Sequence, residues 1–180
     1  MRGRECGLDY NRMFSEKEQQ ITGFERQLDL AREFNLPVFM HEREGFVDAY
    51  RILQKYADVV EQQKVVVHCF TGSKEELAKY IELGCYIGVT GFICKTNRGG
   101  YLSEMIAEVV PLDKLMIETD APFMAPELKN NGKKIHISKN EPGALYHICA
   151  KVAEAYGVSF EAAAIATTQN ALQFFRVPSQ

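Results

Sequence analysis

The sequence predicts an α/β fold of the TIM barrel type, in which parallel strands alternate with helices. Three observations lead to this expectation. Short apolar runs alternate with helical stretches along the chain. Residues that can bind metals stand where these runs end, and TIM barrels carry their chemistry at the carboxyl ends of the strands. A doubly wound sheet is the alternative, but no Gly-x-Gly-x-x-Gly motif supports it.

Five segments fit strands. A short start ends at Glu5, and four apolar runs follow: LPVFMH (36–41), KVVVHCF (64–70), CYIGVTGFI (85–93) and KLMIETD (114–120). Their apolar residues are nearly continuous, which is typical of parallel strands covered on both faces. Crossover helices are therefore expected between them.

The helices have recognisable ends. Ser15 and Ser73 each precede a glutamate by three residues, which is the spacing of a capping box. Asn35 and Gly84 stand where a left-handed residue ends a helix. Further helices are expected around 45–57, near 101–109, from about 142 to 156 and on to about 175, after a Pro/Lys/Asn-rich loop at 121–140.

The composition fits one globular domain. A chain of 180 residues can bury a substantial core. No run of 18 apolar residues is present, so no membrane span is expected. The five cysteines form no C-x-x-C pair, which favours a reducing compartment and an intracellular location, in the nucleus or the cytoplasm. A net charge of −3 predicts no general attraction to nucleic acid, so any such attraction must be local.

Four side chains at strand ends form the candidate site. They are Glu5, His41, His68 and Asp120. Imidazole nitrogen and carboxylate oxygen together suit a divalent ion such as Zn²⁺, Mn²⁺ or Mg²⁺. Either histidine alone fits an ordinary buried histidine, and Asp120 alone fits a turn. Their repetition at equivalent places in successive units predicts a metal site.

Several motifs in order resemble one family. The stretches ECGLDY, PVFMHERE, VVVHCFTGS, YIGVTG, IETDAPF, KNEP and TTQNALQFF together resemble the TatD-type deoxyribonucleases of the metal-dependent hydrolase superfamily, in particular the eukaryotic TatD-domain nucleases. The resemblance implies a (β/α)8 barrel with two divalent metals. It further implies that Glu5 bridges the metals and that His41 and His68 complete one metal's ligands. It implies that Asp120 binds the other metal and handles the proton of the attacking water. Glu5 and Asp120 are thus the implied catalytic residues, and the implied reaction is exonuclease-like hydrolysis of DNA.

The sequence departs from this family at its start. The family begins with a His-x-His pair on the first strand, and no His-x-His occurs here. A whole barrel takes about 250 residues. On the family's plan Glu5 lies on the fourth strand and Asp120 on the eighth. We therefore expect residues 1–180 to form a single, N-terminally truncated hydrolase domain, a partial TIM (β/α)8 barrel with about five of eight strands. We also expect impaired activity and exposed sheet edges capable of self-association.

Basic residues near the strand ends are the expected DNA contacts. They are Arg43, Lys95, Lys133 and Lys134. The Lys133/Lys134 region is expected to steer DNA toward Asp120. Two other functions stay open: hydrolysis of a small amide or ester, because fold does not fix function, and a non-catalytic role as a binding partner.

Overall fold

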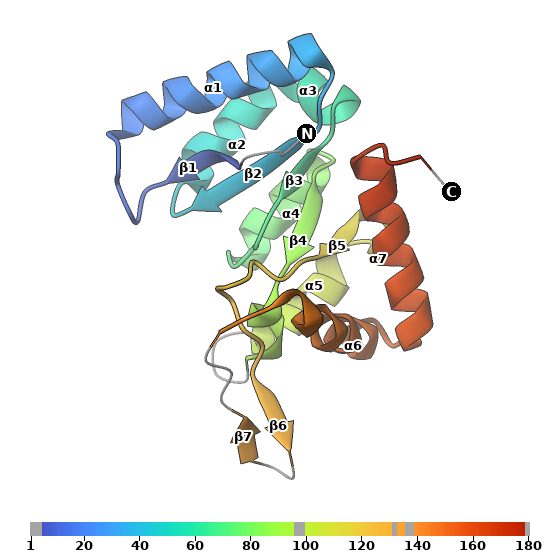
Figure 1. Ribbon diagram of the computed structural model, residues 1–180. Helices are drawn as coiled ribbons and strands as arrows, with labels where there is room; N and C mark the ends of the chain where they lie inside the picture. Colours follow the sequence, from blue (N-terminus) through green and yellow to red (C-terminus); the bar gives the residue numbers. More distant parts are fainter. Residues whose placement is uncertain (1–4, 96–99, 131–132, 136–138, 179–180) are drawn as a thin grey trace. The chain divides into compact units, whose positions relative to one another are not determined.

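Strands and helices alternate along the chain (Figure 1). The computed structural model describes residues 5–95, 100–130, 133–135 and 139–178. The strands of the main sheet follow one another in chain order: β1 (Cys6–Asp9), β2 (Val38–Arg43), β3 (Val65–Val67), β4 (Tyr86–Val89) and β5 (Leu115–Ile117). The α/β class with five parallel strands is thus confirmed.

The helices of the described residues follow the strands. They are α1 (Lys17–Phe34), α2 (Phe46–Lys55), α3 (Ala57–Gln62), α4 (Lys74–Glu82), α5 (Gly100–Val109), α6 (Leu145–Tyr156) and α7 (Phe160–Phe174), with 3-10 turns η1 (Gly91–Cys94), η2 (Leu112–Lys114) and η3 (Pro142–Ala144). None of these helices is long and apolar enough to span a bilayer.

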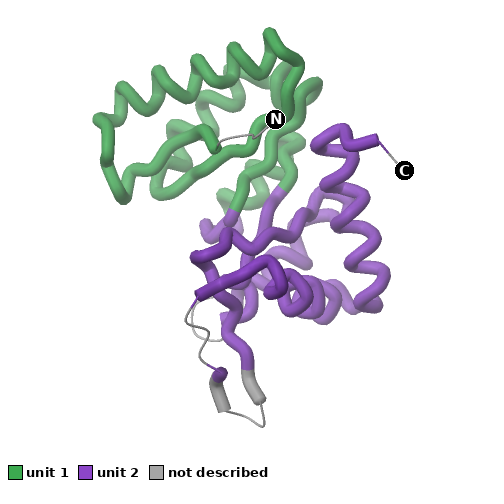
Figure 2. The backbone as a smooth tube through the Cα atoms, in the orientation of Figure 1, with its two compact units in different colours: residues 1–68, 75–86 green, residues 69–74, 87–180 purple. Residues whose placement is uncertain are grey.

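The chain divides into two compact units (Figure 2). Unit 1 comprises residues 1–68 and 75–86, and unit 2 comprises residues 69–74 and 87–180. The single domain expected from the sequence stays a prediction.

In unit 1, β1, β2 and β3 pair in parallel. Gly7 of β1 lies opposite His41 of β2, and Met40 lies opposite Val67 of β3. Helix α1 contacts β1, and its buried face presents Phe24 and Leu28, one helical turn apart. All three residues of β3 are buried, as expected for a strand covered on both faces.

In unit 2, β4 pairs in parallel with β5. Helix α7 contacts β5 and η2, while α6 contacts α5 and α7. The fully buried side chains here include Ile87, Leu115, Ile148 and Val152. The buried amide of Asn170 on α7 donates hydrogen bonds to the carbonyls of Leu112 and Leu115 at 2.8 and 2.7 Å, which fixes the helix against β5.

Three of the predicted helix signals have clear outcomes. Gly84, just after α4, has φ +90, so the left-handed end predicted there is confirmed. Asn35 has φ +51, and its N–H bonds to the last turn of α1, so the left-handed end of that helix is confirmed. The capping box at Ser15 is wrong, because α1 begins at Lys17 with Glu16 as N-cap and no side-chain cap bond. The carbonyl of Ser15 instead accepts a hydrogen bond from Gln20 Nε2 at 2.9 Å, so this segment is positioned by α1 in another way.

The segment 121–140 is more regular than predicted. It contains an antiparallel pair, β6 (Leu128–Asn130) and β7 (Lys133–Ile135), within what the sequence suggested was loop. Three-residue strands of mixed polarity give no periodic signal that would separate them from a loop.

Candidate metal centre

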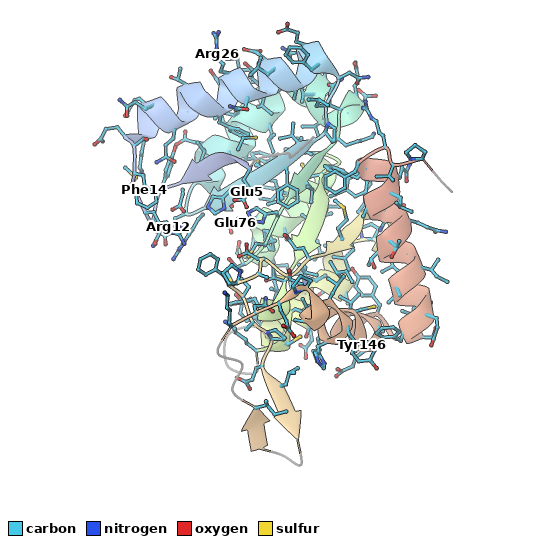
Figure 3. All side chains as sticks on the ribbon, viewed as in Figure 1. Glu5, Arg12, Phe14, Arg26, Glu76 and Tyr146 are labelled. Atoms are coloured by element: carbon cyan, nitrogen blue, oxygen red, sulfur yellow. The ribbon has the colours of Figure 1, made fainter. Side chains whose placement is uncertain are left out.

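Three of the predicted ligands stand on neighbouring strands of unit 1. His41 lies inside β2 and His68 directly follows β3. Glu5, labelled in Figure 3, immediately precedes β1. The expectation that Glu5 ends its strand is therefore wrong. The β1–β2 ladder continues to Asp9 and Arg43, and the Tyr10 N–H donates to the Arg43 carbonyl, so both strands extend past their ligand residues.

The three side chains nevertheless converge. His41 Nδ1 and His68 Nε2 lie 3.1 Å apart, and Glu5 Oε2 lies 3.7 Å from the first and 3.4 Å from the second. One donor atom of each residue lies within 4.8 Å of the other two. His68 is buried, with 4% of its side chain exposed, while half of the Glu5 side chain is exposed. The cluster therefore has one anchored end and one end open to solvent.

These distances suit a single divalent ion. Ligand atoms on a tetrahedral ion with bonds of about 2.0–2.1 Å stand about 3.3 Å apart. The three measured separations, 3.1, 3.4 and 3.7 Å, surround that value. Two imidazole nitrogens and one carboxylate oxygen also match the donor preferences of Zn²⁺ and Mn²⁺. Without an ion, the two ring nitrogens can share one proton in an N–H···N hydrogen bond.

A carboxylate that the sequence interpretation missed lies against this cluster. Asp9 Oδ2 is 3.1 Å from His41 Nε2, and Asp9 Oδ1 accepts hydrogen bonds from the N–H groups of Asn11 and Arg12 at 3.0 and 2.8 Å. Partial burial raises the pKa of Asp9, but the bonds from Arg12, His41 and Asn11 together outweigh it and lower the pKa below its usual value. Glu5 and Asp9 are four residues apart, so alternation along the strand places both on one face, but only the register of β1 against β2 brings Asp9 to His41.

The opposite face of β2 is packed without ligands. Glu42 accepts hydrogen bonds from the Gly45 N–H at 2.8 Å and from the Tyr80 hydroxyl at 3.3 Å. Burial raises the pKa of Glu42. The Tyr80 ring meets Phe46 edge-on, so this side of the strand is an aromatic packing layer.

Asp120 belongs to unit 2, three residues after β5, with φ +52. Its surroundings are well fixed. Asn140 is buried, and its amide donates to the carbonyls of Thr119 and Phe123 at 2.7 and 2.6 Å. Asn140 belongs to the KNEP motif, so one recognisable motif positions the backbone of another. The role of Asp120 as a ligand of a second metal stays a prediction.

The predicted substrate contacts are scattered along the chain. Arg43 is exposed at the end of β2, two residues after His41 and therefore on the same strand face. Lys95 follows η1 in unit 2, and its Nζ lies 5.4 Å from the centre of the Phe92 ring. Lys133 and Lys134 contribute backbone to β7, and their side chains lie outside the described residues.

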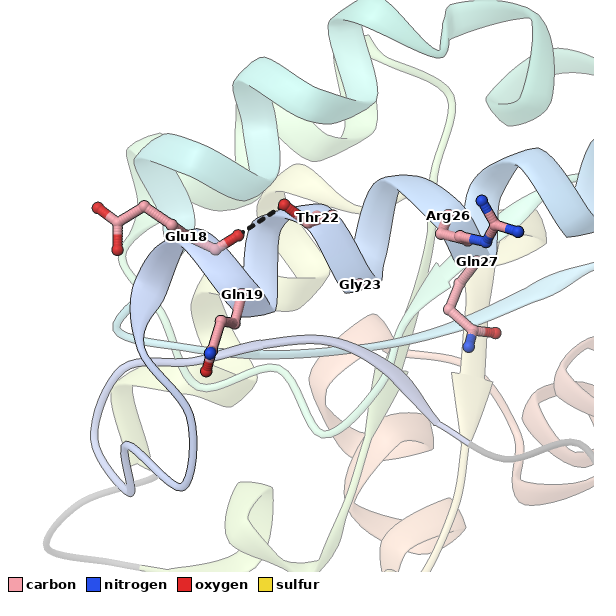
Figure 4. Close-up of a pocket in the computed structure, with 6 residues that line it drawn as sticks. All are labelled: Glu18, Gln19, Thr22, Gly23, Arg26 and Gln27. Carbon is pink, nitrogen blue, oxygen red and sulfur yellow. Dashed lines mark hydrogen bonds between the residues drawn. The ribbon is translucent and has the colours of Figure 1, made fainter.

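A surface groove lies on α1 (Figure 4). It is lined by residues of that helix alone: Glu18, Gln19, Thr22, Gly23, Arg26 and Gln27. The Thr22 hydroxyl donates to the Glu18 carbonyl at 2.8 Å, which is a bond within the helix. The groove contains no histidine or cysteine, and nothing in it indicates chemistry.

Comparison with known proteins places the chain in a family. A family model described as TatD related DNase matches residues 4–176. The chain belongs to the TatD family. The resemblance noted in the motifs is thereby confirmed.

Relatives of this TatD family member include the 3'-5' ssDNA/RNA exonuclease TatD of Citrobacter rodentium. The two are 39% identical over 173 residues, covering 96% of this chain and 64% of the relative. The corresponding exonuclease of Shigella flexneri is 41% identical over 167 residues. This chain thus spans slightly less than two thirds of the length of the curated relatives it matches, with values from 62% to 65%.

Solved structures show the same fold. A TatD family hydrolase from Entamoeba histolytica matches with a TM-score of 0.81 and 26% identity, over 97% of this chain and 62% of that one. The TatD homologue YJJV from Escherichia coli K12 matches with a TM-score of 0.80 and 29% identity, over 97% and 63%.

Proposed function

We propose that this TatD family chain carries a metal-dependent deoxyribonuclease site of the exonuclease type. The observation that supports it best is the convergence of Glu5, His41 and His68, whose donor atoms stand 3.1–3.7 Å apart. Such a set can hold one divalent ion and leaves positions open for water and a phosphate oxygen. The names of the curated relatives, 3'-5' ssDNA/RNA exonucleases, favour a single-stranded nucleic acid as the substrate.

The residues have distinct proposed roles. A divalent ion bound here would supply Lewis-acid polarisation of a phosphoryl oxygen and a lower pKa for water. The two imidazoles, one of them buried, would hold the ion, and the half-exposed carboxylate of Glu5 is proposed to face the substrate. Asp120 is proposed to bind a second ion and to accept the proton of the attacking water, and its fixed backbone suits such a role.

A nuclease assay tests this proposal. Single-stranded DNA carrying a 5′ label is incubated with the chain and Mg²⁺ or Mn²⁺, with and without chelator, and with the 3′ end free or blocked. We expect metal-dependent shortening from the 3′ end, and a loss of roughly 100-fold or more for His68→Ala, which removes a ligand. His147→Ala is the matched control, because His147 lies on α6 outside the cluster.

The alternatives are outcomes of the same assay. Turnover of a small ester or amide without DNA cleavage would favour the small-substrate hydrolase. Metal binding without turnover of any of these substrates would favour a non-catalytic partner.

The phosphate contacts need a separate test. We propose that Arg43, Lys95, Lys133 and Lys134 contact the DNA backbone. Replacing Arg43 by Gln should reduce the salt slope of single-strand binding by about 0.7, the value for one phosphate contact. Arg26→Gln is the control, because Arg26 is exposed on the outer face of α1. Equal slopes for both variants and the wild type would remove Arg43 from the substrate path.

Location and assembly are also proposals. Free thiols and a nuclease substrate fit an intracellular site of action, in the cytoplasm or the nucleus. Self-association through sheet edges would require unoccupied backbone groups on the outer strands.

A further inference from the structure

One ring nitrogen of His41 faces the donor cluster and the other faces Asp9. Nδ1 lies 3.1 Å from His68 Nε2, whereas Nε2 lies 3.1 Å from Asp9 Oδ2. A neutral imidazole carries one N–H donor and one acceptor lone pair. Only the nitrogen without the proton can bind a metal, so the choice of tautomer decides whether His41 can serve as a ligand.

Both oxygens of the Asp9 carboxylate have hydrogen-bond partners. Its second oxygen, Oδ1, accepts the backbone N–H groups of Asn11 and Arg12 at 3.0 and 2.8 Å. An ionised carboxylate has no proton to give, so the partner at Oδ2 must be a donor. His41 Nε2 therefore carries the proton, and the lone pair of Nδ1 points toward Glu5 and His68.

The backbone of Asp9 is fixed independently of any metal. The side chain of Gln20 on α1 accepts from the Asp9 N–H at 2.8 Å and donates to the Asp9 carbonyl at 3.1 Å. With its backbone held by α1 and one oxygen held by the following loop, the carboxylate has little freedom to turn away. About a fifth of the Asp9 side chain is exposed, so water competes weakly with the histidine.

We infer that Asp9 is a positioning residue that holds His41 in its metal-binding tautomer. This inference rests on the metal centre of the proposed function and adds a residue to it. Carboxylates that accept the distal N–H of a ligating histidine fix the ring and raise its basicity, and their loss costs 10–100-fold in metal affinity. The same carboxylate also binds the backbone N–H groups of Asn11 and Arg12 in the loop after β1. One residue therefore orients the His41 ring and also holds the neighbouring loop.

An asparagine at this position gives a specific signature. Two backbone N–H groups point at Oδ1, so the single amide oxygen of Asn should turn to them and its NH₂ should face His41 Nε2. Nε2 must then accept, which moves the proton to Nδ1 and blocks the nitrogen that faces the cluster. Alanine removes the carboxylate without forcing this tautomer. Asp9→Asn should therefore bind metal more weakly than Asp9→Ala, although it keeps more of the loop's hydrogen bonds.

The test compares four forms of the full chain: wild type, Asp9→Asn, Asp9→Ala and Asp48→Asn. Asp48 is the matched control, since it also accepts two hydrogen bonds in unit 1, from Tyr10 and Arg51, but does not contact a ligand residue. Zn²⁺ and Mn²⁺ affinities are measured by competition with a chromophoric chelator, and metal-free stability by urea unfolding. We expect affinity to fall 10–100-fold in both Asp9 variants, most in Asn, with Asp48→Asn unchanged. Metal-free stability should fall most in Ala.

Nitrogen NMR of the metal-free protein provides the second measurement. His41 should carry its proton on Nε2 in the wild type and on Nδ1 in Asp9→Asn, and this comparison stands even if Asp9→Ala does not fold. Wild-type affinity in Asp9→Asn, an affinity order that merely follows stability, or an unchanged tautomer would overturn the inference. If the metal affinities follow the expected order but the chain cuts no DNA, the proposed nuclease function is overturned. The positioning role of Asp9 is then still supported.

Discussion

Gly7 occupies the position of β1 directly opposite His41. Its φ is +141, and a Cβ atom built there would lie 1.9 Å from the His41 carbonyl oxygen. Such an approach leaves no room for any side chain, since backbone cannot yield as a flexible side chain does. The glycine of ECGLDY therefore lets the strand that carries Glu5 and Asp9 approach the strand that carries His41.

Replacing Gly7 by Ala should destabilise the chain by more than about 2 kcal/mol, because both the backbone conformation and the space are unsuitable. Gly23→Ala is the control. Gly23 lies in the middle of α1, and a Cβ atom added to it would meet no atom within 4 Å, so helix propensity should stabilise that variant by about 0.5–1 kcal/mol. Urea unfolding of both variants gives the comparison. An unchanged free energy of unfolding in Gly7→Ala would mean that β1 and β2 can move apart at little cost.

At the scale of single residues, the sequence predicted the three side chains that converge but not the residues that position them. Glu5, His41 and His68 were predicted because their residue types recur beside apolar runs. Asp9 and Gln20 were missed because an acidic residue before a turn and a glutamine in a helix are common in any protein. Their roles follow from the β1–β2 register and from the place where α1 begins, and neither is encoded in a local pattern.

Amide side chains occupy some of the outward-facing backbone groups of the outer strands β1 and β5. In β1, the N–H and carbonyl of Asp9 point away from β2 and are occupied by the Gln20 amide. In β5, the carbonyl of Leu115 is occupied by the Asn170 amide. Each unit thus uses an amide side chain from the helix that covers the strand. Covering edge groups in this way limits pairing with other chains.

Removing one of these amides should expose an edge. Gln20→Ala should lower the free energy of unfolding by about 1–3 kcal/mol, since several backbone groups lose their partner. It should also increase concentration-dependent association, measured by sedimentation velocity. Gln19→Ala, at an exposed position of the same helix, should change neither quantity. Identical behaviour of the two variants would show that Gln20 does not protect the edge.

Element types were more predictable than element limits. Continuous apolar runs identified β2 to β5, because strands buried on both faces need them. The start of α1 was misplaced because Ser15 and Glu18 satisfy a local rule that Gln20 overrides through contacts with β1. Tertiary contacts, which a local rule does not include, decided that boundary.

All three converging donors belong to unit 1. Bound metal should therefore stabilise this part of the chain selectively, by about 2.7 kcal/mol at a free concentration 100 times the dissociation constant. Hydrogen exchange with and without Mn²⁺ should show added protection in residues 5–68 and 75–86, and little in helices α6 and α7 of unit 2 (145–174). His68→Ala should abolish the effect. Protection spread evenly over the chain would contradict a centre confined to unit 1.

The division into two units could not be predicted from the sequence. No linker, repeat or change of composition marks it, since the segments of each unit are interleaved. The family and the fold class, by contrast, could be predicted from the motifs, because most of the motifs contain the end of a strand and the turn that follows it.

The interleaving has a consequence for any attempt to dissect the chain. The backbone passes between the units three times, after His68, after Lys74 and after Tyr86. No single peptide bond can be cut to release either unit intact. A fragment ending at His68 would retain the three converging side chains of the proposed metal centre but lose α4, and with it the Tyr80 hydroxyl that donates to Glu42 on the opposite face of β2.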